Sequence, residues 1–318
     1  MGTSIDKRSA VVPTNLMAVD RRHALKIGAA LAGSVLMPEM AWAADCYDLR
    51  CVGGNNYITA IKDQDDPVPC NSCTAFAVVA AVEGTYNKTK SLVPNLDLDE
   101  MKLFTAGATV PSGGCGTSHW WPKYALEVCK STGLQGQGSS PVTAVKITDF
   151  SNLLRQNLNL TQGEIKTWLQ TKGPVVAVMV QYEDFYTWGK IWSEQNPGQP
   201  NPYVYEPGKE LDICQPTTAT VCQCQTTASP ATSASSTTAR MASRPLKRTP
   251  GSPVGGHVVT IVGFDDTTTP KAWICKNSWG SDWNGNGFVL IAQGAPGRPN
   301  IPKCYIDEID VYGINGIA

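Results

Sequence analysis

Histidine, charged residues and long apolar runs are scarce in this chain of 318 residues. It carries 26 basic and 27 acidic residues, and its formal net charge is −1 at pH 7. Lysines and arginines do not gather into the basic stripe that a nucleic-acid-binding protein needs, so we expect no nucleic-acid partner. With 42% apolar and 17% charged residues, the composition is typical of a globular protein with a substantial core.

The scarcity of histidine argues against a metal site. Of the three histidines, only His119 and His257 lie beyond the N-terminal segment. Cys70 and Cys73 have the spacing of a zinc ligand pair, but no second pair with finger-like spacing accompanies them. We therefore expect no structural zinc, and no other metal or organic cofactor.

No apolar run is long enough to span a bilayer. The run at 27–37 has eleven residues, whereas a transmembrane helix needs about 20. Arg21 and Arg22 precede this run, and Ala41 and Ala43 are small residues of the kind that a signal peptidase requires. Residues 1–43 are therefore predicted to be a signal similar to twin-arginine signals, with export to the periplasm or the extracellular space. An uncleaved anchor is the alternative.

Cysteine, in contrast, is abundant. Eleven cysteines suit an oxidising compartment, where disulfides persist, and this agrees with export. The number is odd, so ten cysteines could pair and leave one free, reactive thiol.

Helical patterns precede strand patterns along the chain, an order that indicates an α+β fold. Residues 73–84 are apolar on nearly every side, as in a buried helix, and Asn71 and Ser72 are acceptable N-caps for it. Residues 216–253 are rich in Thr, Ser and Ala and predict a low-complexity surface insertion. The expected helices are 73–84, 97–104, 121–130 and 163–172, and the expected strands are 174–180, 257–264, 271–276 and 287–292.

Cys73 begins the predicted buried helix, where the helix dipole favours a negative sulfur. A lone cysteine would be better interpreted as half of a disulfide. Cys73, however, lies in a segment that begins with Gln64 and ends in Cys70-Asn71-Ser72-Cys73-Thr74-Ala75-Phe76. This segment resembles the active-site segment of the papain family of cysteine proteases. The resemblance implies that Cys73 is the nucleophile, and that Gln64 and the Cys73 N–H donate hydrogen bonds to the oxyanion.

A second block, about 180 residues later, carries the same resemblance. Gly256-His257-Val258 and Asn277-Ser278-Trp279-Gly280 look like the histidine strand and the Asn-Ser-Trp-Gly segment of the family. His257 begins one predicted strand and Asn277 ends its neighbour, so a hairpin can place the two side chains together. A neutral amide can hold the imidazole without discharging an imidazolium. We expect His257 to be the base, Asn277 to orient it and Trp279 to shield their hydrogen bond.

The resemblance also implies a fold and two disulfides. The fold is papain-like, with a helical half, an antiparallel β half and a cleft between them, and residues 44–318 form the catalytic domain. Cys70 would pair with Cys115, and Cys304 would pair with Cys214, Cys222 or Cys224. The odd cysteine would then be the nucleophile. An exported bacterial member of the family is the expectation.

Three departures from the family pattern stand out. Thr74 replaces the aromatic residue that usually follows the nucleophile. Thr117 and Ser118 stand where the family has glycines that bind the extended substrate, and the nearby His119 is interpreted as a cleft-wall residue. The predicted signal also leads directly into the domain, which leaves no room for a long inhibitory pro-segment.

The expected activity is thiol-dependent hydrolysis of peptide bonds by an imidazolium–thiolate pair. The partner is a peptide or protein substrate, and the mature protein is expected to be a monomer without membrane attachment. One alternative is a catalytically silent papain-like domain that binds a partner in the cleft. Another is an amidase or acyl transferase that acts on non-protein peptides.

Overall fold

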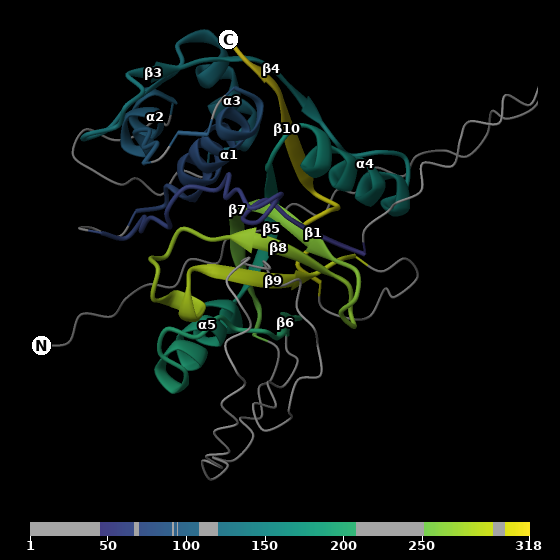
Figure 1. The fold of residues 1–318 in the computed structure, drawn as a ribbon. Helices are drawn as coiled ribbons and strands as arrows, with labels where there is room; N and C mark the ends of the chain where they lie inside the picture. The colour runs from purple at the N-terminus through teal and green to yellow at the C-terminus, as the bar shows by residue number, and fades with distance from the viewer. Residues whose placement is uncertain are drawn as a thin grey trace, which may run out of the picture. The chain divides into compact units, whose positions relative to one another are not determined.

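After the short strand β1, three helices come first along the described chain, and most of the strands follow them, as expected for the predicted α+β fold (Figure 1). The computed structural model describes most of the unit formed by residues 43–318. The described residues are 45–66, 70–90, 92–93, 95–107, 120–207, 251–294 and 303–318. The predicted signal, Cys115, His119 and nearly all of the predicted insertion lie outside these ranges.

The first three helices pack together and form the helical part of the fold. Helix α1, Cys73–Thr89, is buried along most of its length, as its apolar sequence predicts. Helices α2, Glu100–Gly107, and α3, Pro122–Ser131, contribute Phe104 and Leu126 to the same core. Helix α1 also packs against strands β7 and β10, so it joins the helical part to the sheet (Figure 1).

Ser72 occupies the N-cap position of α1, but its hydroxyl does not cap the helix. The hydroxyl is buried and has no hydrogen-bond partner among the described residues. Instead, the Ser72 carbonyl accepts from the N–H groups of Ala75 and Phe76. Ser72 is thus one of the two predicted N-cap residues, but the helix start depends on backbone bonds.

The β part is an eight-stranded sheet in the order β4-β10-β5-β7-β8-β9-β6, with β1 paired to β7. All its pairs are antiparallel except β6 with β9. A separate hairpin joins β2, Leu134–Gln135, to β3, Ala144–Val145. The strands of the sheet are β1 Cys46–Asp48, β4 Ile147–Asn152, β5 Val175–Tyr182, β6 Val204–Tyr205, β7 Pro253–Asp265, β8 Ala272–Lys276, β9 Phe288–Ala292 and β10 Asp310–Ile317.

The central strand β5 buries both of its faces. Val176 and Val178 belong to the core shared with α1, whereas Val175, Ala177 and Met179 belong to the second core on the other face. This alternation follows from the two-residue period of a strand and explains why residues 175–180 are all apolar. The sheet thus separates two hydrophobic cores.

Two more helices border the second core. Helix α4, Leu158–Thr171, starts five residues earlier than predicted because Asn157 caps it by accepting from the Leu160 N–H. Helix α5, Glu183–Gln195, was not predicted; it follows β5 directly and packs on the short 3-10 helix η1, Trp283–Gly285. No helix among the described residues is both long and apolar enough to cross a membrane.

The cysteine pairing expected from the sequence is partly wrong. Cys73 is a free thiol, but so are Cys129, Cys275 and Cys304, all three of them buried. The expected bridge through Cys304 is therefore absent, and the three buried thiols pack as small apolar side chains. Cys70 is disulfide-bonded, but its predicted partner lies outside the described residues.

Candidate active site

The predicted nucleophile, base and oxyanion residue meet at one cavity. Gln64, Cys73 and His257 all line a space of about 440 Å³, together with Trp279. Cys73 is the first residue of α1, and His257 lies in β7, the strand against which α1 packs. Residues 184 positions apart in the sequence are thus brought to one site by the contact between a helix and a strand.

Asn277 lies behind His257 and holds its ring. The distance between His257 Nε2 and Asn277 Oδ1 is 2.8 Å, and both residues are 3% exposed. An amide oxygen can only accept, so Nε2 carries the hydrogen and donates it. In the neutral ring, Nδ1 is then unprotonated and can accept the Cys73 proton. The β7–β8 hairpin makes this contact possible, since β8 ends at the residue before Asn277.

Trp279 covers this hydrogen bond. Its ring stacks on His257 with a centroid distance of 4.8 Å and an interplanar angle of 29°. Phe185 and Trp283 contact the other parts of Trp279, at centroid distances of 5.4 and 5.1 Å. These aromatic side chains fix the position of Trp279 and shield the His257 ring from water.

Gln64 is held by two side-chain hydrogen bonds and one backbone hydrogen bond. Its Nε2 donates to the Cys70 carbonyl over 2.8 Å, and its Oε1 accepts from the Ser278 hydroxyl over 2.6 Å. The Gln64 backbone N–H also donates to the Ser278 carbonyl. One Nε2 hydrogen has no role in these bonds and is available for an oxyanion in the cavity. The sequence motif alone indicated no role for Ser278, whereas in the structure Ser278 holds the Gln64 side chain.

Burial opposes separate charges on the two reacting groups. It raises the pKa of the Cys73 thiol, although the N–H groups of Val258, Thr74 and Cys73 partly lower it. It also lowers the pKa of His257 to about 4, against the smaller effect of the Asn277 hydrogen bond. Each shift by itself favours the neutral group at pH 7, and the expected imidazolium–thiolate pair stays a prediction. The two charges can form only together, by transfer of the thiol proton to His257.

Thr74 has a structural role at the cavity wall. Its hydroxyl donates to the Trp120 carbonyl over 2.5 Å, and the side chain is buried. Trp120, Trp121 and Pro122 line the cavity on this side. Thr74 replaces the aromatic residue that is usual in the family, and it attaches the start of α1 to the cavity wall that contains Trp120 and Trp121.

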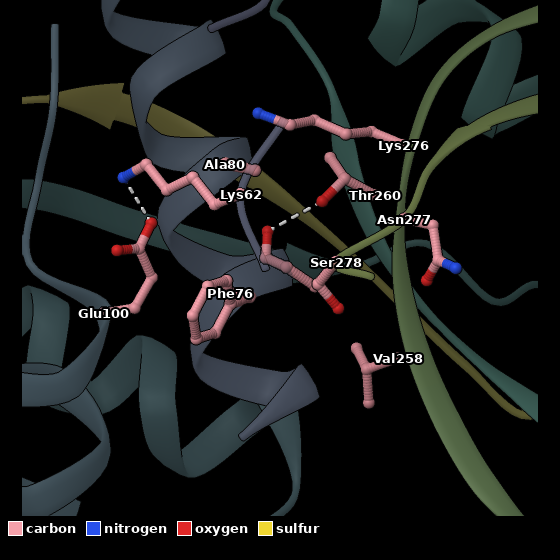
Figure 2. A pocket seen from close by; sticks show the side chains of 10 residues that line it. Lys62, Phe76, Ala80, Glu100, Val258, Thr260, Lys276, Asn277 and Ser278 are labelled. Atoms are coloured by element: carbon pink, nitrogen blue, oxygen red, sulfur yellow. Dashed lines mark hydrogen bonds and ion pairs between the residues drawn. The ribbon is translucent and has the colours of Figure 1, made fainter. Parts of the chain in front are cut away.

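A buried network of charges lies behind the site, and the sequence did not reveal it. Lys62 Nζ lies 3.3 Å from a carboxylate oxygen of Glu83, 2.6 Å from one of Asp97 and 2.5 Å from one of Glu100. Figure 2 shows Lys62 and Glu100 in contact on one side of a small pocket, with Lys276 and Asn277 on the other side. The network joins the segment before Gln64 to helices α1 and α2.

The network contains groups with shifted pKa values. Burial raises the pKa of Glu100 to about 7, although Lys62 opposes this shift. Burial lowers the pKa of Lys276 to about 8, and its Nζ donates to the carbonyl and hydroxyl oxygens of Thr59 over 3.0 Å. Because Lys276 directly precedes Asn277, this network also fixes the end of β8. Among the described residues, no group of three or more His, Cys, Asp or Glu side chains is arranged to hold a metal ion.

Known proteins with similar sequences are cysteine proteases. Cathepsin J of Rattus norvegicus is 26% identical over 262 residues, a match that covers 74% of this chain and 58% of the relative. The cathepsin L-like proteinase of Fasciola hepatica is 24% identical over 239 residues, with 75% of this chain and 58% of the relative covered. The chain therefore spans less than two thirds of the length of these curated relatives.

Solved structures with the same fold are also known. Bromelain from Ananas comosus, in complex with the E64 inhibitor, superimposes with a TM-score of 0.52 at 19% identity. That match covers 85% of this chain and 98% of bromelain. Procathepsin L2 from Tenebrio molitor gives a TM-score of 0.52 at 18% identity, with 85% and 68% covered. Both likenesses bear on the fold alone and confirm its papain-like α+β architecture.

The family described as papain family cysteine protease matches residues 43–201 and 231–314. These two stretches make up more than half of the chain, and they include Gln64, Cys73, His257 and Asn277. The chain belongs to the papain family of cysteine proteases.

Proposed function

We propose that this protein hydrolyses peptide bonds with Cys73 as nucleophile, His257 as base and acid, Asn277 as the residue that orients His257, and Gln64 as an oxyanion donor. The observation that carries the proposal is the shared cavity of Gln64, Cys73 and His257, with His257 held by Asn277 from behind. A nucleophile, a base, a group that orients the base and an oxyanion donor are the four parts that thiol catalysis of acyl transfer needs.

The reaction proceeds in two halves. Cys73 Sγ attacks the substrate carbonyl carbon while its proton passes to His257 Nδ1. The oxyanion accepts from the Cys73 N–H, which has no partner within the helix, and from the free Nε2 hydrogen of Gln64. The C–N bond then breaks, and the leaving nitrogen takes the proton from His257. Water, deprotonated by His257, hydrolyses the thioester and regenerates the thiol.

Cleavage of a peptide library, followed by mass spectrometry, tests the activity. The purified protein should cleave peptide bonds in the presence of a reducing agent, and Cys73→Ala and Asn277→Ala should lower the rate, the former to background. Cys129→Ala is the matched control, because that thiol is buried in the core away from the cavity. Cleavage that survives in Cys73→Ala would contradict the proposal.

Peptide cleavage, Cys73 reactivity and activity on non-protein peptides together separate the two alternatives. A silent binding domain would cleave no peptide and would leave Cys73 unreactive in the folded, reduced protein. An amidase or acyl transferase would act on non-protein peptides, such as those of peptidoglycan, and spare the library. The aromatic cavity walls and the held Gln64 side chain support the peptidase instead, since an apolar cleft beside a fixed oxyanion donor suits a peptide chain.

We also propose that the protein is an exported bacterial enzyme, that its mature form begins after Ala43 and that it is a monomer. The paired arginines before an apolar run and the large number of cysteines support export. Mass spectrometry of the protein from the periplasm or medium should find an N-terminus at Ala44. Replacement of Arg21 and Arg22 by lysine should retain the precursor in the cytoplasm; a mature protein exported equally well would contradict a twin-arginine route.

A further inference from the structure

The leaving group of the substrate must lie on the side of the cavity that His257 lines. His257 gives its proton to the leaving nitrogen, so the substrate residue that carries this nitrogen lies next to the His257 ring. Trp279, Tyr186 and Gly256 line the cavity together with His257. Trp120 and Trp121 line it from the helical part, next to α3. The residue after the scissile bond therefore meets a different set of side chains from the residues before it.

Tyr186 presents an open aromatic surface there. Its ring lies edge-on to Trp279, with a centroid distance of 5.7 Å and an interplanar angle of 66°. The side chain is 49% exposed, although the backbone is fixed because the Trp283 indole N–H donates to the Tyr186 carbonyl over 3.2 Å. Trp279 is itself fixed by its stack on His257. Two rings at an angle thus form a rigid apolar corner beside the base.

Gly256 leaves space opposite this corner. It directly precedes His257 in β7 and is exposed, and a Cβ atom added to it would meet no atom within 4 Å. The neighbouring Gly255 is equally open. Among the described residues, Gly256 therefore borders the cavity without a side chain, which leaves room for a large substrate side chain.

Charge is scarce at the cavity. The ionisable side chains among the described lining residues are those of Asp65, Cys73, Tyr186 and His257. Asp65 is the only carboxylate among them, and they include no lysine or arginine. Asp65 adjoins Gln64, and burial raises the pKa of its carboxyl. An acidic substrate residue next to Tyr186 would find no opposite charge among the described lining residues, and a basic one would find only Asp65, whereas an apolar one would gain from burial.

We propose that Tyr186 and Gly256 determine specificity by accepting an aromatic or large aliphatic residue directly after the scissile bond. This inference rests on the proposed peptidase function. Tyr186 and Trp279 supply the contact surface, and Gly256 supplies the space. Neither Tyr186 nor Gly256 takes part in the proton transfers.

Quenched fluorescent peptides that differ only in the residue after the scissile bond test the inference. For the wild type, kcat/KM should be roughly tenfold higher with Phe or Leu than with Gly, Asp or Lys at that position, as expected for burial of one apolar side chain. Tyr186→Ser should remove most of this preference, and Tyr186→Phe should keep it. Gly256→Val should lower the ratio of Phe to Gly substrates, because its side chain fills the space.

The outcomes separate this inference from the function on which it rests. Equal kcat/KM for all five peptides, or an undiminished preference in both Tyr186→Ser and Gly256→Val, would overturn the specificity proposal while leaving the peptidase intact. Failure of the wild type to cleave any peptide, with Cys73 unreactive, would overturn the peptidase itself. Thermal unfolding of each variant shows whether it is folded, and Tyr186→Phe shows whether the ring or only the fold is required.

Discussion

Ser278 donates a hydrogen bond from its hydroxyl to Gln64 Oε1 over 2.6 Å, and both residues are buried. Ser278 follows Asn277 in the chain, so two adjacent residues hold the proposed base, His257, and the proposed oxyanion donor, Gln64. Loss of this bond should leave Gln64 bonded only to Cys70 through its side chain. The oxyanion donor would then be less well aligned in the transition state.

Ser278→Ala should therefore lower kcat with little change in KM, by up to about tenfold, the value of one hydrogen bond. Gln64→Ala should cost more, about 100-fold in kcat, because it removes the donor itself. Initial rates with one peptide substrate measure both. A Ser278→Ala variant that loses as much activity as Gln64→Ala, or that changes KM alone, would contradict the role given to Ser278.

Cys73 should be the only reactive thiol among the four that the described chain leaves free. Burial raises the pKa of Cys129 to about 12 and raises those of Cys275 and Cys304 as well, and these three lie in the core. Iodoacetamide at pH 8 should alkylate Cys73 in the folded protein and leave the other three unmodified, as peptide mapping can show. Unfolding in urea should expose all four. Rapid labelling of Cys304 in the native state would mean that its environment is open.

His257 should titrate well below an ordinary histidine when the thiol is removed. In Cys73→Ser, burial should hold the pKa of His257 near its value of about 4, far below that of the unfolded chain. The native state then binds fewer protons than the unfolded state between pH 6.5 and 4. Stability should fall as the pH falls through this window, by about 3 kcal/mol in all. NMR of the imidazole protons measures the pKa, and a value of 6.5 or higher would contradict the expectation.

Glu83 should be essential for stability. Its carboxylate is fully buried and accepts from the Thr59 hydroxyl over 2.5 Å and the Leu98 N–H over 2.8 Å, besides its contact with Lys62. Glu83→Gln places an amide N–H against one of these donors and should lower the free energy of unfolding by about 3 kcal/mol. Urea denaturation measures the loss.

The matched control is Lys130→Ala, which removes an exposed ion pair with Asp149. Its denaturation midpoint should stay close to that of the wild type, since solvent screens such pairs. If Glu83→Gln were as mild as this control, the network behind the active site would not be a structural anchor.

The sequence predicted the elements that carry a continuous apolar pattern. Helix α1 and strand β5 are buried along most of their lengths, and both were expected from their apolar sequences. Strand β10 was missed because Gly313 and Gly316 interrupt its pattern. Gly313 is required by packing, since a Cβ there would lie 2.3 Å from the Trp168 ring. Such a requirement depends on a distant residue and leaves no local signal.

The proposed catalytic residues come from the family resemblance, whereas the residues that hold them in place were not predicted. The contact of Lys62 with Glu100 joins residues 38 positions apart and has no sequence pattern of its own. Tyr186 was not identified either, because helix α5 was not expected and its aromatic residues gave no sign of facing the cavity. The sequence therefore indicated the proposed reacting groups, and the structure adds the contacts that hold them and the side chains that line the cavity beside them.

The most direct test of the central claim is covalent labelling of the purified, reduced protein with an epoxide inhibitor of thiol proteases. We expect one equivalent of inhibitor on Cys73, identified by peptide mapping, and loss of this labelling in His257→Ala because the thiol then lacks its base. Retained labelling in Asn277→Ala at a reduced rate would agree with its orienting role. A folded wild-type protein in which Cys73 stays unlabelled would contradict the account.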